Sequence, residues 1–189
     1  MDRTSRVVAH RGLTLVELMI TLVILSVTVT LATPAMQQLL HGSRLRSETS
    51  RLLDAINLAR SEAVFRNTPV SLCPSSMATS AVPDCGGDLA GGWIVFTNRN
   101  RDDVVDTGSD EILGAFASIP PGYSLTNLAG TRAADEVITY LPDGTSRRNL
   151  SLLLCPPGGN PVQPWTVVLN SVGRARAARG EGQCPPGGG

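Results

Sequence analysis

The chain has 189 residues, in which 16 arginines balance 16 acidic side chains and no lysine occurs. Zero net charge argues against a protein that binds nucleic acid through bulk charge, so any such binding must be local. With 42% hydrophobic and 17% charged residues, the composition excludes a disordered chain and predicts a packed core.

The first predicted element is an uninterrupted apolar run over residues 13–33, with fourteen apolar residues, five threonines, one serine and one glutamate. As a helix this run would be roughly 31 Å long, enough to cross the hydrocarbon core of a bilayer. A short segment with Arg3, Arg6 and Arg11 precedes it, and such basic flanks stay on the cytoplasmic side. We therefore predict a single membrane span over residues 13–34, with the rest of the chain outside the cytoplasm.

Glu17 is the one charged residue in this run. A carboxylate inside an apolar span is costly unless it is paired, so Glu17 is a candidate functional residue. Its own helix offers no basic side chain within reach after Arg11, and the partner must be a new N-terminus or another chain. A secretory signal is disfavoured because no small-residue cleavage site follows the run, and a plain membrane anchor leaves Glu17 unexplained.

The segment Arg11-Gly12-Leu13-Thr14-Leu15-Val16-Glu17-Leu18 resembles the prepilin cleavage and methylation motif of type IV pilins and type II secretion pseudopilins. The resemblance implies that a prepilin peptidase removes residues 1–12 by cutting between Gly12 and Leu13, and that the Leu13 amine is then methylated. It also implies that Glu17 meets the N-terminal ammonium of a neighbouring subunit, which sets the register of a filament. Leu13 departs from the phenylalanine that usually follows the glycine.

Residues 35–67 are predicted to continue the helix beyond Pro34, which would kink or locally melt it by removing one backbone hydrogen bond. Apolar residues then recur at helical spacing along one face, at Leu45, Leu52, Ile56, Ala59 and Ala63. Asn67-Thr68-Pro69 should end the helix, because the residue before a proline is disfavoured in the α region. We expect this amphipathic half of the helix to pack on a globular domain.

The remaining residues, 68–189, are predicted to form a globular β domain. Short runs typical of strands lie at 70–73, 92–97, 112–116, 123–125, 137–141, 150–155 and 165–169. Pro142-Asp143-Gly144 is a turn signature that joins two of them. A long helix followed by about seven strands predicts an α+β fold, with the helix packed on an antiparallel sheet domain.

The order of elements also carries a resemblance. The chain is similar to the GspH/FimT branch of the pilin family in the order of three features: a long helix, then Val-x-Leu-Cys-Pro from Val70, then Gly-Trp-Ile-Val-Phe from Gly92. The resemblance implies a non-enzymatic minor pilin or pseudopilin in the bacterial inner membrane, with its globular domain in the periplasm. Its implied partners are other pilins, the prepilin peptidase and membrane lipid. Both a type II secretion pseudopilus and a type IV pilus fit the N-terminal motif.

The four cysteines, Cys73, Cys85, Cys155 and Cys184, all follow the membrane span and should therefore lie in an oxidising compartment. None forms a Cys-x-x-Cys pair, and His41 is the one histidine beyond the leader, so neither a zinc site nor a cofactor is expected. Four cysteines allow three pairings. We favour Cys73–Cys85 and Cys155–Cys184, because each bridge closes a Gly/Pro-rich segment that needs constraint.

The segment from Asn98 to Asp106 has oxygen-bearing side chains at several positions of a calcium loop. However, Asp103 stands where that loop needs glycine, and Ser109 stands where it needs a bidentate glutamate. We interpret the segment as a solvated connection between strands, and the acidic cluster from Asp102 to Glu111 as surface or as a contact for a neighbouring subunit. The sequence contains no nucleophile elbow, phosphate loop or metalloprotease motif, so an enzyme is not expected.

Arginines gather near the end of the chain. Arg174 and Arg176 alternate, so they would project to the same side of an extended strand, and Arg179 would extend the patch against Glu181. Gly173-Arg174-Ala175-Arg176 resembles the Gly-Arg-x-Arg motif with which FimT-type minor pilins hold DNA during natural transformation. This resemblance implies double-stranded DNA as a further partner. The alternative is that the arginines only solubilise the edge of a final strand.

Overall fold

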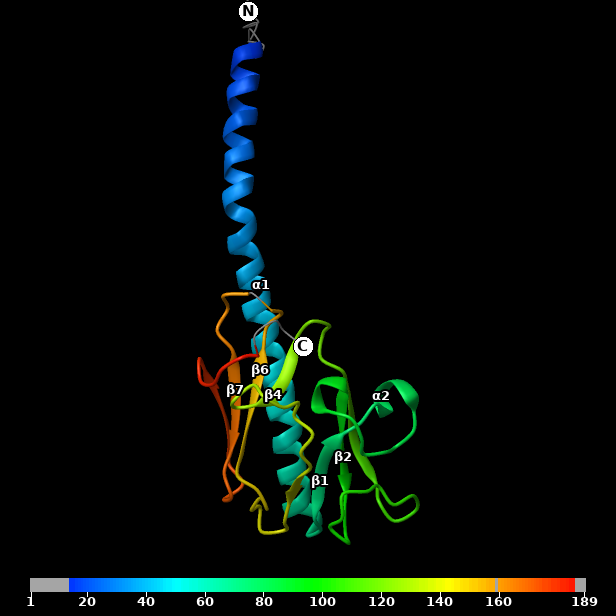
Figure 1. Cartoon of the computed structure of the whole chain (residues 1–189). Coiled ribbons are helices and arrows are strands. Elements are labelled where there is room, and N and C mark those ends of the chain that lie inside the picture. Colours follow the sequence, from blue (N-terminus) through cyan, green and yellow to red (C-terminus); the bar gives the residue numbers. More distant parts are fainter. Residues whose placement is uncertain (1–13, 159, 186–189) are drawn as a thin grey trace, which may run out of the picture. The chain divides into compact units, whose positions relative to one another are not determined.

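The computed structural model of the chain describes residues 14–158 and 160–185 (Figure 1). The cleavage and methylation site predicted at Gly12 and Leu13 lies outside these residues. The chain divides into two compact units, residues 1–39 and residues 40–189. Helix α1 (Leu15–Arg66) belongs to both units, and each unit is described in turn.

In the first unit, hydroxyl groups satisfy backbone groups of helix α1. Thr14 Oγ1 accepts a hydrogen bond of 3.2 Å from the Glu17 N–H, as an N-cap residue does. Five further hydroxyls each donate at 2.8 Å to a carbonyl of the preceding turn, namely those of Thr21, Ser26, Thr28, Thr30 and Thr33. Because these hydroxyls find their partners within the helix, they do not prevent it from lying in an apolar environment.

The large apolar side chains of this segment are exposed, from Leu15 at 74% to Leu39 at 70%. By length and composition the helix can cross a membrane. Helix α1 continues through Pro34, so the described helix shows no local melting at this residue. The kink expected at Pro34 stays a prediction.

In the second unit, one face of helix α1 supplies a large part of the core. The residues of the predicted apolar face are all buried, at 3% exposure or less: Leu45, Leu52, Ile56, Ala59 and Ala63. The helical spacing therefore predicted the buried face correctly. Because these side chains fill the core, the compact unit begins at Leu40, well before the first strand.

Two four-stranded antiparallel sheets complete the second unit. The first has the order β3 (Ile112–Ala117), β2 (Gly92–Thr97), β1 (Val70–Pro74) and β5 (Ile138–Tyr140). The second has the order β4 (Ser124–Asn127), β6 (Leu150–Cys155), β7 (Trp165–Leu169) and β8 (Ala175–Arg179). The short helix α2 (Met77–Ser80) and the 3₁₀ turn η1 (Leu89–Gly91) lie between β1 and β2 in the chain. In the view of Figure 1, β1 and β2 lie to the right of the lower part of helix α1, and β7 lies to its left.

The predicted α+β fold is confirmed, and each of the seven predicted strands matches an observed one to within about two residues. Strand β8 lies outside those seven runs, although the alternating arginines were already expected to lie on an extended final strand. The turn at 142–144 reverses the chain directly after β5: the Gly144 N–H donates to the Leu141 carbonyl at 2.8 Å, and Tyr140 forms an antiparallel bridge with Ser146. The chain then crosses to β6, which belongs to the second sheet.

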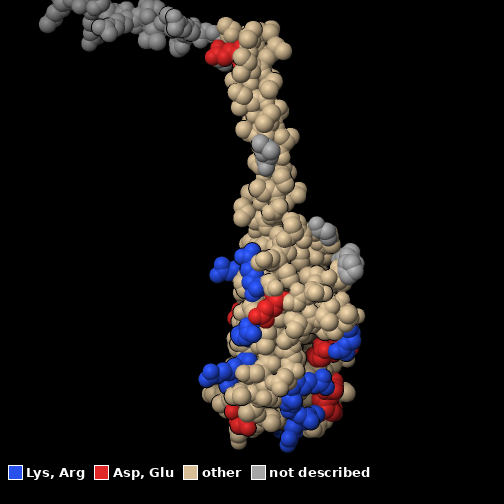
Figure 2. Space-filling model, turned by 60° about the vertical axis from the view of Figure 1, so that its left-hand side comes forward, with Lys and Arg blue, Asp and Glu red and all other residues tan. Residues whose placement is uncertain are grey.

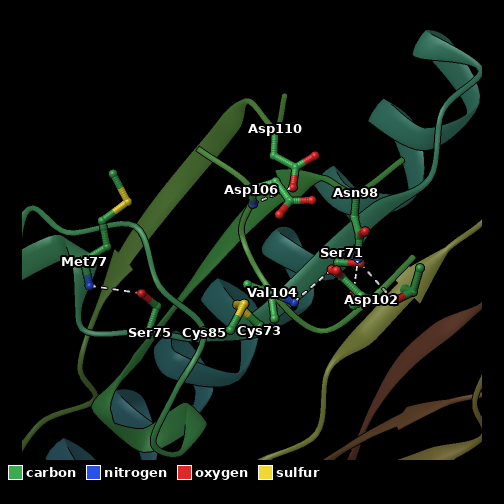
Figure 3. Close-up of a disulfide and its surroundings, with 11 residues drawn as sticks. Ser71, Cys73, Ser75, Met77, Cys85, Asn98, Asp102, Val104, Asp106 and Asp110 are labelled. Carbon is green, nitrogen blue, oxygen red and sulfur yellow. Dashed lines mark hydrogen bonds between the residues drawn. A yellow bond between two sulfur atoms is a disulfide. The ribbon is translucent and has the colours of Figure 1, made fainter. Parts of the chain in front are cut away.

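Two disulfides pin loops to the sheets, and they join the pairs that the sequence favours. Cys73 of β1 is joined to Cys85 in the loop after α2, with Cα atoms 5.6 Å apart (Figure 3). Cys155 of β6 is joined to Cys184 near the end of the chain, with Cα atoms 5.7 Å apart. The segment before Cys184 is also held by a hydrogen bond of 3.3 Å from the Gln183 N–H to the Leu128 carbonyl.

Candidate assembly and nucleic-acid contact sites

Glu17 lies in the first turn of α1, where a carboxylate is favoured by the helix dipole. Its side chain is exposed, and no basic side chain of the described residues lies within 4.0 Å of it. The first basic residue after Glu17 in the chain is Arg44. The carboxylate therefore has no charge partner on the described part of its own helix.

The predicted DNA motif lies at the free edge of the second sheet, where β8 pairs only with β7. A tight turn leads into β8: the Gly173 N–H donates to the Asn170 carbonyl at 2.9 Å, and the Arg174 N–H donates to Asn170 Oδ1 at 2.9 Å. Gly173 has a φ of 81°, and a Cβ atom there would overlap the Gly144 carbonyl oxygen. The glycine of the motif is therefore required by the turn itself.

The register of β8 divides the arginines between two faces. Arg176 lies opposite Val168, and Arg179 lies opposite Trp165, three residues away along β7. Because side chains alternate along a strand, Arg176 and Arg179 point to opposite faces. The expectation that Arg179 extends the patch of Arg174 and Arg176 is therefore wrong. In addition, the Arg176 guanidinium lies 3.7 Å from the Glu181 carboxylate, which partly neutralises it.

Sequence reasoning missed a second group of arginines close to this turn. Arg101, Arg147 and Arg148 line a pocket of ≈ 310 Å³, together with Asp102, Asp103, Val137 and Thr139. Figure 2, which brings the β7–β8 side forward, shows Lys/Arg atoms gathered over the lower end of the globular unit, with acidic atoms beside them. The adjacent Arg147 and Arg148 were a visible signal in the sequence, but their proximity to residues 170–174 depends on the fold.

The acidic connection between β2 and β3 folds on itself (Figure 3). Asn100 Nδ2 donates to the carboxylates of Asp102 and Asp106 at 2.8 and 2.7 Å, and Asp110 Oδ2 accepts from the Asp106 N–H at 2.9 Å. Asn98 Nδ2 donates to Ser71 Oγ of β1 at 2.9 Å. Within the described ranges, no three His, Cys, Asp or Glu side chains are grouped to hold a metal ion. These carboxylates act as hydrogen-bond acceptors for their own loop.

Two titratable groups near the 170–174 turn have shifted pKa values. Burial raises the pKa of Tyr140 to about 12, and the Tyr140 hydroxyl donates to the Gly173 carbonyl at 3.2 Å. The hydrogen bonds that Asp143 accepts from the Thr145 hydroxyl and N–H lower the pKa of its carboxyl. Both groups therefore keep one protonation state around neutral pH. Tyr140 holds the 170–174 turn, whereas Asp143 holds its own turn through Thr145.

The chain has the architecture of type IV pilin-like subunits. The first part of its long helix is apolar and exposed, and the second part packs on antiparallel sheets. The type IV minor pilin FimU of Pseudomonas aeruginosa PAO1 has a similar structure, with 18% identity, a TM-score of 0.51, and coverage of 72% of this chain and 89% of that one. So does the minor pseudopilin EpsH of the Vibrio cholerae type 2 secretion system. Its two structures have 13% and 15% identity, TM-scores of 0.50, and coverage of 72% and 75% of this chain and of 97% and 98% of EpsH.

Two family models match the chain. The model described as type II transport protein GspH matches residues 48–173, and the prokaryotic N-terminal methylation motif matches residues 9–33. The chain therefore belongs to the GspH family. No curated protein sequence matches it significantly.

Proposed function

We propose that the chain is a non-enzymatic subunit anchored in the bacterial inner membrane by its N-terminal helix, with the globular unit in the periplasm. A prepilin peptidase would cut between Gly12 and Leu13, and the new Leu13 amine would be methylated. The anchored subunit would then move from membrane lipid into a filament of other pilins. Glu17 carries this proposal, because it is the one charged residue between Leu15 and Leu39 and has no basic partner among the described residues.

The charge of Glu17 sets the expected role. In an apolar filament interior, a carboxylate is stabilised by an ammonium group close to it. Cleavage after Gly12 creates such an ammonium four residues before Glu17, and a neighbouring subunit presents the same group. The Glu17 side chain is exposed and has no basic side chain of the described residues within 4.0 Å, so it is free for this contact.

Replacement of Glu17 tests the proposal in cells that make the complete filament. Glu17→Ala and Glu17→Gln should both insert and be cleaved normally, because the cleavage site is untouched, and both should be depleted at least about tenfold from sheared filaments. That factor corresponds to the loss of about 1.4 kcal/mol of interaction free energy, a modest value for a charge pair in an apolar environment. Mass determination of the mature chain would establish whether cleavage and methylation occur at Leu13.

Thr21→Val is the matched control, because it removes a polar group one turn further along without changing charge. It should enter filaments as the wild type does. Normal incorporation of both Glu17 variants would overturn the role of this carboxylate in assembly, and an uncleaved chain would overturn the prepilin interpretation.

A second candidate function is contact with double-stranded DNA, favoured by the exposed Arg174 and Arg176 at the free edge of β8. Arginine side chains can make bidentate hydrogen bonds to phosphate but read no base sequence in this arrangement. The full chain in a neutral detergent should therefore bind duplex DNA weakly and without sequence preference. Arg174→Gln with Arg176→Gln should weaken binding about tenfold or more at low salt. Equal binding by this variant would show that the pair only solubilises the strand edge.

A further inference from the structure

The two sheets have four terminal strands, and two of these already pair with another segment of the chain along their outer edges. Residues 132–134 pair with β4, and residues 145–147 pair with β5, through backbone hydrogen bonds of 2.9 to 3.2 Å. The other two terminal strands are different. Among the described residues, β3 pairs only with β2, and β8 pairs only with β7. The globular unit therefore has two free sheet edges.

The free edge of β3 presents unpaired backbone groups. The Thr97 N–H donates to the Glu111 carbonyl at 3.0 Å, so every second residue of β2, counted back from Thr97, bonds to β3. These residues of β2 lie opposite Gly114 and Phe116. Ala115 lies between those two, so its N–H and carbonyl point away from β2, and the residue is exposed. In the described part of the chain, no backbone group beyond β2 bonds to it.

The free edge of β8 has the same pattern. The Asn170 N–H donates to the Arg174 carbonyl at 3.2 Å, and the Gly180 N–H donates to the Pro164 carbonyl at 2.9 Å. Between these two bonds the even-numbered residues of β8 bond to β7. The odd-numbered residues, which include the exposed Ala177, therefore direct their backbone groups outward.

The two free edges have opposite charge. At the start of β3, Arg66 contacts the carboxylates of both Glu62 and Glu111, which leaves an excess of negative charge, and Asp110 adds a further carboxylate. Strand β8 and the residue before it carry three arginines, against the single carboxylate of Glu181. Arginines protect an edge from strands that lack complementary charge, whereas the acidic start of β3 supplies that charge.

Strands β3 and β8 run in the same direction. Figure 1 shows β2 and β7 running toward the lower end of the globular unit, and β3 and β8 are antiparallel to them. In this view β2 lies to the right of the lower part of α1 and β7 to its left, so the free edges lie on the outer sides. Two copies in the same orientation can therefore place β3 of one beside β8 of the next. Antiparallel pairing of β3 with β3 would instead reverse α1 in one copy.

We propose that β3 of one copy pairs in parallel with β8 of a second copy, so that the Glu111 end of β3 meets the Arg174 end of β8. Because the two edges are different surfaces, the contact is heterologous and repeats from copy to copy. A single strand pair is smaller than the roughly 1,000 Å² of a stable interface, so it needs copies held side by side. The inference therefore rests on the membrane anchoring in the proposed function.

Photo-cross-linking of the full chain in the membranes of producing cells tests the pairing. With a photoreactive benzoylphenylalanine at Ala177, irradiation should give a covalent dimer, and mass spectrometry should map the second attachment point to Ile112–Ala117. Ala115→Pro removes an outward N–H without removing a bond between β2 and β3, which edge strands tolerate. It should lower the dimer yield at least about fivefold, the equivalent of one hydrogen bond. Ala115→Ser keeps this N–H and is the matched control, with the yield of the parent chain.

Exchange of the charges tests the alignment of the two strands. Arg174→Glu should lower the dimer yield, because it places like charges together, and Arg174→Glu with Glu111→Arg should restore it. This exchange still tests the contact if Ala115→Pro fails to fold, as judged by its disulfides and protease resistance.

Three results would overturn the inference: an unchanged yield in folded Ala115→Pro, a cross-link to β8 of the second copy, or a cross-link to a different protein instead. Absence of a dimer, with the chain in the membrane fraction, would also overturn it and leave the proposed anchoring standing. Absence of the chain from the membrane fraction would overturn both.

Discussion

Gly173 and Tyr140 link the arginine turn to the core of the globular unit. Gly173 adopts a left-handed conformation with its Cα next to the Gly144 carbonyl, where no other residue fits without displacement. Its own carbonyl accepts the hydrogen bond of the fully buried Tyr140 hydroxyl. The motif glycine is therefore explained by local packing, and its presence alone does not indicate a DNA contact.

Tyr140 also gives the globular unit a dependence on alkaline pH. Its pKa in the folded state is about 12, above the value of about 10 for an unfolded chain. A raised pKa means that the folded state keeps its proton longer, so the stabilisation is complete below about pH 10 and is lost progressively between about pH 10 and 12. Tyr140→Phe should cost about 1 kcal/mol of unfolding free energy at pH 7, because a hydrogen bond is lost.

Denaturant unfolding at several pH values checks this expectation. Burial also raises the pKa of Tyr123, so both proteins should lose stability in alkali, and the difference between wild type and Tyr140→Phe isolates Tyr140. That difference should shrink above pH 10. A constant difference from pH 7 to 12 would show that Tyr140 titrates normally in the folded state.

Residue-level prediction from the sequence succeeded where the signal was local. The favoured cysteine pairs are the ones that the structure joins, whereas the assembly role of Glu17 stays a prediction. It failed where a site depends on long-range pairing. Arg147 and Arg174 are 27 positions apart, and their loops are brought together by tertiary contacts that include the hydrogen bonds between Ser146, Ser171 and Asn149.

At the level of elements, hydrophobic periodicity predicted helix α1 and seven strands, because those segments carry their own pattern of apolar residues. Strand β8 has the sequence Ala-Arg-Ala-Ala-Arg, which contains no β-branched or aromatic residue. It forms because β7 offers a free edge to pair with, so its stability is tertiary in origin. Its arginines are also the kind of charge that protects an edge strand from pairing with another chain.

The sheet to which each strand belongs could likewise not be predicted from local sequence patterns. Strands β5 and β6 are neighbours in the chain and are joined by a strong turn signature, yet they pair with β1 and with β4 and β7 respectively. The chain reverses at residues 142–144, where Tyr140 bridges to Ser146, and then crosses to the second sheet, which shares a core with the first sheet and with helix α1. A turn motif indicates where the chain reverses but does not indicate which strands it pairs.

At the level of the whole molecule, the chain combines a segment that contributes nothing to the described core with a unit that has a complete one. The first core residue of α1 is Leu45, and every large apolar side chain reported between Leu15 and Leu39 is more than half exposed. Both disulfides and all eight strands belong to the unit that begins at Leu40. The N-terminal segment is therefore available for lipid or for neighbouring subunits without any loss to the core.

A chain that begins at Leu40 should consequently fold on its own. We expect it to be monomeric without detergent, because the exposed apolar surface of residues 15–39 is gone, and to unfold in a single cooperative transition with both disulfides formed.

The matched control is a chain that begins at Asn57, which lacks Leu45, Leu52 and Ile56 of the core face. Loss of even one such buried side chain costs about 2–5 kcal/mol, so the loss of all three should exceed the stability of a typical domain and leave the chain unfolded. Calorimetry and sedimentation would check both chains. Aggregation of the Leu40 chain, or cooperative folding of the Asn57 chain, would show that the boundary of the folding unit does not lie between these two residues.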